Sequence, residues 1–307
     1  MRTTTLFSLL SAAAAVYEPN YTAGKIYQLN NGTWIENLTQ RTNLSCFTRL
    51  TRYDSPEVQE VNLLHPHSGP RTIYTFANAT SATGITELST ERYAVLTLNH
   101  AVNTTTVSIW TLQTNALLPI ATKVADSIVD SELLNGLAAV SPHIVLATNS
   151  FVGGIVRINL QNGIADEISA GDSFPAGVNG LKYQEPYLYY TNMFEGVFGR
   201  IAVDPSTGAP AGEAEVIASG DILVGADDFA LAYWTNAAFV ANYEKNTVVR
   251  INIDEKTAEV VVKEIPAPTP ATFGASGGLF FATSGTGSDG GASLWRIMVP
   301  EEPPFDL

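Results

Sequence analysis

Six polar residues with side chains suited to acid–base or hydrogen-bonding chemistry open six similar stretches of this 307-residue chain: Glu36, Thr83, Asn135, Asn179, Asp227 and Thr272. After each opener come a short apolar run, a turn and a β-rich segment. The pattern is clearest in Val178–Asn192 (VNGLKYQEPYLYYTN) and in its near twin, Leu134–Asn149. Because the openers are far apart in sequence, their carboxylates and amides can work together only if the fold brings the six stretches to one place.

The spacing of the openers predicts such a fold. They recur every 44–52 residues, the strands are short, and no helical periodicity is present. This is typical of an all-β, six-bladed β-propeller with one four-stranded antiparallel blade per repeat. We expect one domain over residues 17–307. We also expect Lys25–Leu29 to form the outer strand of the last blade beside Leu294–Val299, which closes the ring and protects its edges.

In a four-stranded blade, the loop before the inner strand and the loop between strands two and three lie on the same face. That face should gather the openers and the residues that follow each second strand, giving a polar floor with an aromatic rim. This composition is typical of small-molecule sites. The candidates from the second-strand ends are His100, Phe151, Phe194 and Tyr243.

Each candidate also has a structural interpretation. Asn135 and Asn179 can brace local backbone, and Glu36 can be a solvated loop carboxylate. We expect one member of the Asp227–Asp228 pair to face the axis and the other to brace its blade. His100 can be a surface residue beside a glycosylation sequon instead of an acid or base. Phe151, Phe194 and Tyr243 can pack the rim, and the four tryptophans are interpreted as blade packing.

Composition excludes several classes of partner. A formal net charge of −14 is incompatible with the basic surface that nucleic-acid binding needs, and it disfavours anionic membranes. The single cysteine, Cys46, rules out an intrachain disulfide, and we expect it to be buried and inert. No Walker loop, dinucleotide fingerprint, G-x-S-x-G or H-E-x-x-H is present, so flavin, nicotinamide or pyridoxal chemistry has no support.

The first sixteen residues have one arginine, a short apolar run and small residues, as a secretory signal peptide does. No other segment approaches transmembrane length, so we expect a secreted monomer without membrane insertion. N-x-S/T sequons support secretory entry, although Asn37 and Asn43 sit near a predicted strand and need not be modified. The six sequon asparagines are Asn20, Asn31, Asn37, Asn43, Asn78 and Asn103.

Several of these motifs resemble the regucalcin/gluconolactonase superfamily of six-bladed propellers. The closer likeness is to fungal secreted members, a hetero-Diels–Alderase-like group that acts in the biosynthesis of tropolonic sesquiterpenoids. The likeness covers roughly Gly24 to Val299, and its motifs specify the fold better than the reaction. They are W-x-E-N at 34–37, N-G-L at 135–137, V-N-G-L-K at 178–182, Y-L-Y-Y-T-N at 187–192 and D-D-F at 227–229.

In the hydrolytic members of that superfamily, a divalent cation lies on the axis. By motif position, the resemblance implies Glu36, Asn179 and Asp227 as its ligands here, with Asn135 nearby. Oxygen ligands of this kind suit Ca²⁺ or Mg²⁺. Three departures weaken the match. The first repeat reads T-N-L-S-C at 42–46 and lacks the usual glycine after Asn43. Asp228 stands where those relatives carry glycine, and no further acidic partner of a lactonase can be placed beyond Asp227.

Three functions remain open. The first is a pericyclase that joins a tropolone-type quinone methide to a humulene-type terpene and needs no cofactor. Its polar contacts would come from Glu36, Asp227, His100 or Tyr243, its apolar wall from Phe151 and Phe194, and further substrate contacts from Asn135 and Asn179. The second is a divalent-cation-dependent lactone or ester hydrolase. The third is a secreted binding propeller without enzymatic activity.

Overall fold

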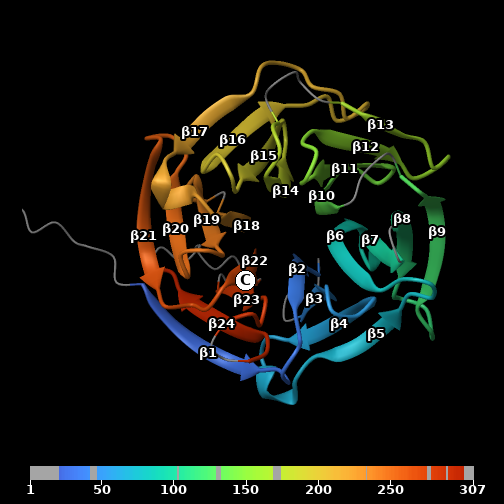
Figure 1. Ribbon diagram of the computed structural model, residues 1–307, viewed down its shortest axis with the longest axis horizontal. Helices are drawn as coiled ribbons and strands as arrows, with labels where there is room; N and C mark the ends of the chain where they lie inside the picture. Colours follow the sequence, from blue (N-terminus) through green and yellow to red (C-terminus); the bar gives the residue numbers. More distant parts are fainter. Residues whose placement is uncertain are drawn as a thin grey trace, which may run out of the picture.

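The computed structural model describes residues 21–41, 47–101, 104–128, 133–168, 174–232, 234–274, 278–287 and 290–300. The predicted signal peptide, Cys46, Asn20, Asn43 and Asn103 lie outside these ranges. The described chain forms six four-stranded antiparallel sheets arranged as blades around one axis, with no α-helix among its elements (Figure 1). The prediction of an all-β, six-bladed propeller is therefore confirmed.

Each blade runs outward from an inner strand at the axis. Blades one to three are β2 (Ile35–Gln40), β3 (Phe47–Arg52), β4 (Glu57–Asn62), β5 (Arg71–Thr75); β6 (Ser81–Ser89), β7 (Arg92–Ala101), β8 (Thr104–Gln113), β9 (Ile120–Asp126); and β10 (Leu134–Ser141), β11 (Ile144–Asn149), β12 (Ile155–Asn159), β13 (Ala165–Glu167). Blades four to six are β14 (Val178–Gln184), β15 (Tyr187–Asn192), β16 (Val197–Ala202), β17 (Glu215–Ser219); β18 (Ala226–Ala232), β19 (Ala237–Asn242), β20 (Thr247–Asn252), β21 (Thr257–Lys263); and β22 (Pro268–Phe273), β23 (Leu279–Thr283), β24 (Ser293–Met298) with β1 (Thr22–Gln28). Two short 3₁₀ turns, η1 (Pro66–Ser68) and η3 (Asp221–Leu223), lie in loops.

The ring closes through the first strand of the chain. β1 pairs antiparallel with β24, from Thr22 opposite Met298 to Gln28 opposite Ser293, and becomes the outer strand of blade six (Figure 1). This confirms the predicted closure, with the strand beginning three residues before Lys25. Because the last blade is completed by the other end of the chain, the ring cannot open without breaking this ladder.

Apolar side chains of adjacent blades form the core between the sheets. Between blades two and three, Leu96 and Ile109 pack with Val145 and Val156, all of them fully buried. Burying one such side chain stabilises the fold by roughly 1.5–3 kcal/mol. With one cysteine, the chain forms no intrachain disulfide, so these interfaces and the ring closure hold the blades together.

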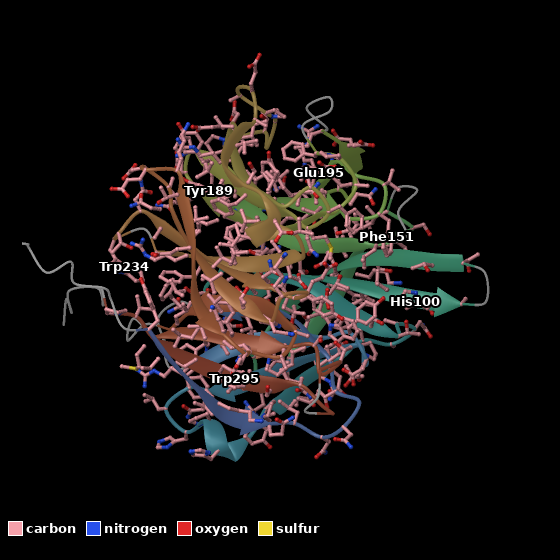
Figure 2. The ribbon with its side chains drawn as sticks, turned by 60° about the vertical axis from the view of Figure 1, so that its left-hand side comes forward. His100, Phe151, Tyr189, Glu195, Trp234 and Trp295 are labelled. Atoms are coloured by element: carbon pink, nitrogen blue, oxygen red, sulfur yellow. The ribbon has the colours of Figure 1, made fainter. Side chains whose placement is uncertain are left out.

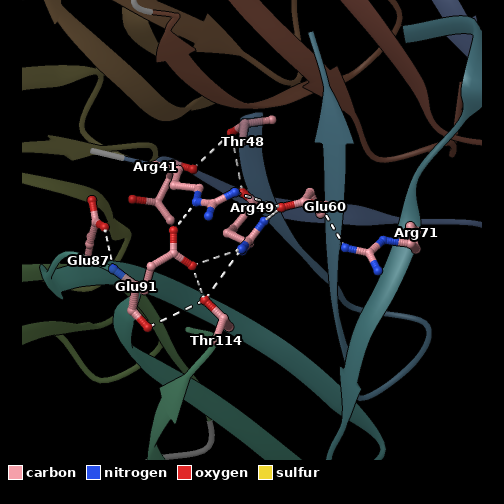
Figure 3. Close-up of polar contacts among 9 residues, drawn as sticks. Arg41, Thr48, Arg49, Glu60, Arg71, Glu87, Glu91 and Thr114 are labelled. Carbon is pink, nitrogen blue, oxygen red and sulfur yellow. Dashed lines mark hydrogen bonds and ion pairs between the residues drawn. The ribbon is translucent and has the colours of Figure 1, made fainter. Parts of the chain in front are cut away.

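A buried ion network also joins blades one and two (Figure 3). Arg49 on β3 pairs with Glu60 on β4 and reaches Glu91, at the turn between β6 and β7, with its Nη2 3.5 Å from the Glu91 Oε2. Arg41 pairs with Glu91 as well, and Thr114 donates a hydrogen bond to its carboxylate. The Arg49 and Glu91 side chains are only 3% and 8% exposed, and each faces two groups of opposite charge, which offset the cost of burying its own charge.

No described helix is long and apolar enough to cross a lipid bilayer. Two of the described sequon asparagines, Asn31 and Asn78, are exposed. Asn37 differs, because it is 2% exposed on the inner strand β2, and the fold leaves no room for a glycan there.

Candidate functional site

The inner strands place the predicted openers at one end of the axis. Glu36, Asn135, Asn179 and Asp227 are each the second residue of an inner strand, and the pairing with the next strand is irregular at that point. A bulge of this kind re-aims a side chain. All four side chains are 5–8% exposed. The prediction that these distant residues share one end of a ring of inner strands is confirmed.

Threonine hydroxyls of the neighbouring blade hold two of these positions. Thr148 donates to the backbone carbonyl of Asn179 at 2.6 Å, and Thr191 donates to that of Asp227. Glycine follows Asn135 and Asn179 because the inner strands approach closely. A Cβ on Gly136 would collide with the Asn179 carbonyl, and one on Gly180 would lie 2.7 Å from the Asp228 carboxylate. The N-G-L motif is therefore a packing requirement of the ring.

The sixth opener was predicted in the wrong register. Pro268 pairs with Thr283 just as Val178 pairs with Asn192, so the equivalent residue is Thr269 and Thr272 lies three residues further along the strand. The prolines at 266, 268 and 270 predict a stiff connection into the sixth repeat, but Pro268 and Pro270 are part of β22. Inner strands tolerate proline because their axis-facing edge has no hydrogen-bonded neighbour.

Two buried carboxylates, Glu36 and Asp227, interact electrostatically at this end of the axis. Asn135 Nδ2 donates to Glu36 Oε1 at 2.8 Å, and the charge of Glu36 raises the pKa of Asp227. Burial raises the pKa of Glu36 to about 7, against the weaker opposing effects of Asn135 and of the Trp34 indole. Burial, then the charges of Glu36 and Asp228, hold the pKa of Asp227 well above its usual range. The pair therefore retains a proton near neutral pH.

A third carboxylate has a different partner. Asp228 is 1% exposed, and its Oδ2 accepts a 2.6 Å charged hydrogen bond from Lys182 Nζ on β14. Burial raises the pKa of Asp228 and Lys182 lowers it. This agrees with the expectation that one of the two aspartates braces the blade, because Asp228 links blade five to blade four.

The amide of Asn179 is only partly satisfied. Its Nδ2 contacts Met193 Sδ at 3.6 Å, while its buried Oδ1 has no hydrogen-bond donor in the described chain. Within the described chain, the Asp227 carboxylate does not accept a side-chain hydrogen bond either. The amide oxygen of Asn179 and the carboxylates of Asp227 and Glu36 are the type of ligand that a hard cation such as Ca²⁺ prefers. In the described ranges, no three His, Cys, Asp or Glu side chains gather as a metal-binding group.

An aromatic shelf lies next to Glu36, made of Trp34, Tyr53 and Tyr243. The Trp34 ring is 5.1 Å from Tyr53 and stacks on Tyr243 at 6.4 Å with an interplanar angle of 18°. The backbone of Trp34 is fixed by Asp54 Oδ1 at 2.7 Å and by the Tyr53 N–H at 3.0 Å. Burial raises the pKa of Tyr53, as does the charge of Glu36. Sequence reasoning missed Trp34, which was interpreted as blade packing but stacks on Tyr243 at this end of the axis.

The other rim candidates lie further out. His100 is exposed on the β7–β8 hairpin, which projects beyond the neighbouring loops (Figure 2), and its ring is 6.1 Å from Tyr53. Phe151 and Phe194 are 56% and 54% exposed. Within the described ranges, neither ring packs against Trp34, Tyr53 or Tyr243. Asn192 braces its loop by donating to the Pro175 and Ala176 carbonyls, so it is a structural residue.

Comparison with known proteins identifies the fold. No protein-family model and no curated protein sequence matches the chain. A luciferin-regenerating enzyme superposes with a TM-score of 0.69 and 13% identity, over 94% of this chain and 98% of that one. A calcium-binding regucalcin from Agrobacterium tumefaciens gives 0.64 and 14%, over 91% and 95%. The aldose sugar dehydrogenase of Streptomyces coelicolor, bound to PQQ, gives 0.59 and 12%, over 91% and 99%. At such identities the likeness establishes the propeller fold and leaves the reaction to the site itself.

Proposed function

We propose that the axis end formed by Glu36, Asp227 and the aromatic shelf is the active site of a hetero-Diels–Alderase-like enzyme. The observation that supports this is a pair of buried carboxyls that keeps a proton near neutral pH beside stacked aromatic rings. A carboxylic acid held neutral in a dry site is a strong hydrogen-bond donor and general acid.

In this proposal the acid generates the reactive diene. Protonated Asp227 gives its proton to a hydroxyl leaving group on a tropolone-type precursor, and the C–O bond breaks to release water. The ionised member of the pair accepts the precursor's ring hydroxyl proton, so charge and atoms balance and a quinone methide results. Asn135, bonded to Glu36, keeps that carboxylate oriented, and Asn179 adds a polar contact.

The second step needs position more than chemistry. The quinone methide and an apolar humulene-type alkene form one C–C and one C–O bond without any further proton transfer. Holding two reactants in register can contribute roughly 7–11 kcal/mol to lowering such a barrier. The flat rings of Trp34 and Tyr243 suit stacking on the tropolone, while exposed Phe151 and Phe194 suit the terpene. His100 and Tyr243 would donate hydrogen bonds to the polar partner.

The test is turnover of a hydroxymethyl tropolone precursor with humulene, followed by mass spectrometry for the cycloadduct, in buffer with EDTA. Wild type should form the adduct, and Asp227→Asn should lose at least 100-fold in rate because the amide cannot donate a proton in this way. Glu255→Gln is the matched control, since Glu255 is an exposed carboxylate in a turn of blade five. An adduct rate equal in wild type and Asp227→Asn would contradict the proposal.

A second candidate is a divalent-cation-dependent lactone or ester hydrolase, favoured by the unpartnered Oδ1 of Asn179 at the same end of the axis as Glu36 and Asp227. Glu36, Asp227 and Asn179 would hold the ion, which when bound supplies a Lewis acid. Asp227 and Glu36 would then both be ionised. This function predicts opening of aldonolactones with added Ca²⁺ and its loss in EDTA.

Folded protein without either turnover would favour a secreted binding propeller. We propose secretion and a monomeric state with each of the three functions, on the basis of the leader sequence and the closed ring. Size-exclusion chromatography of protein from the culture medium tests both properties.

A further inference from the structure

A cavity opens at the other end of the propeller axis. It has a volume of about 270 Å³ and is lined by residues of four inner strands, β2, β14, β18 and β22. Gln40, for example, is the last residue of β2, whereas Glu36 is its second. Because the cavity touches the far ends of these strands, it is separate from the carboxyl pair and the aromatic shelf.

The lining combines one charge with hydrogen-bond donors and an apolar wall. Among the residues that line the cavity, Lys182 is the only charged one. Gln40, Gln184 and Thr272 add amide and hydroxyl groups. Leu231 and Phe273 belong to the apolar wall, together with two alanines. An ammonium next to an apolar wall matches a compact organic anion better than a sugar or a cation.

Lys182 has bonding capacity left for such a ligand. An ammonium has three N–H donors, and in the described chain one of them serves Asp228. The Lys182 side chain is 24% exposed, while its partner Asp228 is 2% exposed. Lys182 thus lies between a buried carboxylate on one side and the cavity on the other.

We propose that this cavity binds a small organic carboxylate, with the anion on Lys182 and an aromatic or branched hydrocarbon part against the apolar wall. Its volume is just below the roughly 300–1,000 Å³ of pockets that hold drug-sized ligands, so the ligand is of simple metabolite size. Binding at this site does not depend on which reaction occurs at the opposite end.

The test uses benzoate and its neutral counterpart benzamide, titrated into the full-length folded protein by isothermal calorimetry. Benzoate should bind saturably and at least tenfold more tightly than benzamide. Lys182→Met should weaken benzoate at least tenfold, and Thr272→Val severalfold, while Glu255→Gln should leave its affinity unchanged. Equal affinity for the two probes, or unchanged benzoate binding by Lys182→Met, would overturn the proposal.

Lys182→Met leaves Asp228 buried without its cation and can prevent folding. If Lys182→Met does not fold, the double variant Lys182→Met/Asp228→Asn, which removes both charges, replaces it in the benzoate titration. The calorimetric readout needs no turnover, so failure of the proposed cycloaddition and failure of this site are distinguished.

Discussion

Replacing Glu36 by glutamine should make the protein more stable, by an amount that depends on pH. Glu36 is 6% exposed, and burial raises its pKa from 4.5 to about 7. Between those values the native state holds a proton that the unfolded chain has lost. Stability therefore falls as pH rises from about 4.5 to 7 and is level above that. Glutamine removes this penalty, and its Oε1 can still accept the hydrogen bond from Asn135.

The magnitude follows from the two pKa values. A difference of about 2.5 pH units at about 1.36 kcal/mol each gives a gain of about 3 kcal/mol at pH 8 for Glu36→Gln. At pH 5.5, still above the sequence pI of about 4.6, the gain is about 1.4 kcal/mol. A gain of 3 kcal/mol corresponds to a rise of about 5–10 °C in Tm.

Urea unfolding followed by tryptophan fluorescence measures both gains, with EDTA present so that no divalent cation offsets the repulsion. Glu255→Gln, an exposed control, should change stability by less than about 0.5 kcal/mol. A variant no more stable than wild type at pH 8, or a gain equal at the two pH values, would refute the link between burial, pKa and stability. If added Ca²⁺ stabilises wild type but not Glu36→Gln, the cation-dependent hydrolase gains support.

Three further changes test other parts of the structure. Arg49→Met should cost about 3–5 kcal/mol in urea unfolding because it removes the most buried cation facing Glu60 and Glu91, which keep only the more exposed Arg41 and Arg71. A loss below about 1 kcal/mol would show that the network is dispensable. Thr191→Val removes the hydroxyl that holds the Asp227 carbonyl and should lower the unfolding free energy by about 1–2 kcal/mol. The control Thr207→Val, at an exposed threonine, should leave it nearly unchanged. Trp34→Leu should weaken tropolone binding about tenfold with Tm nearly unchanged, and full retention of affinity would remove the aromatic shelf from the site.

The sequence predicted the ring and the residues at its axis because both depend on periodic features. Glu36, Asn135, Asn179 and Asp227 each open a repeat, and a propeller places equivalent positions around one axis. The sixth repeat was misaligned because its opener, Thr269, lies between two prolines and lacks the polar–Gly–apolar pattern of its counterparts. A local pattern cannot fix a register that is set by pairing with β23.

Contacts between blades could not be read from the sequence. Lys182 and Asp228 are 46 residues apart, and nothing in the spacing of either repeat indicates which lysine meets which carboxylate. The same holds for the Arg49–Glu91 pair, which joins β3 to a turn of the next blade. Trp34 was misassigned because it precedes its opener, where only the three-dimensional loop shows that it faces Tyr243.

A comparison of equivalent positions around the ring bears on the proposed role of Glu36 and Asp227. In blades two and six, the equivalent positions are Thr83 and Thr269, and each hydroxyl donates to the carbonyl that precedes the next blade's opener, at 2.8 and 2.7 Å. A threonine therefore closes the contact between inner strands with a satisfied hydrogen bond and no buried charge. Blades one and five instead place Glu36 and Asp227 at that position, where burial disfavours their charged forms. Since a threonine fills the same position without a buried charge, the two carboxyls support the proposal that this end of the axis acts on a bound molecule.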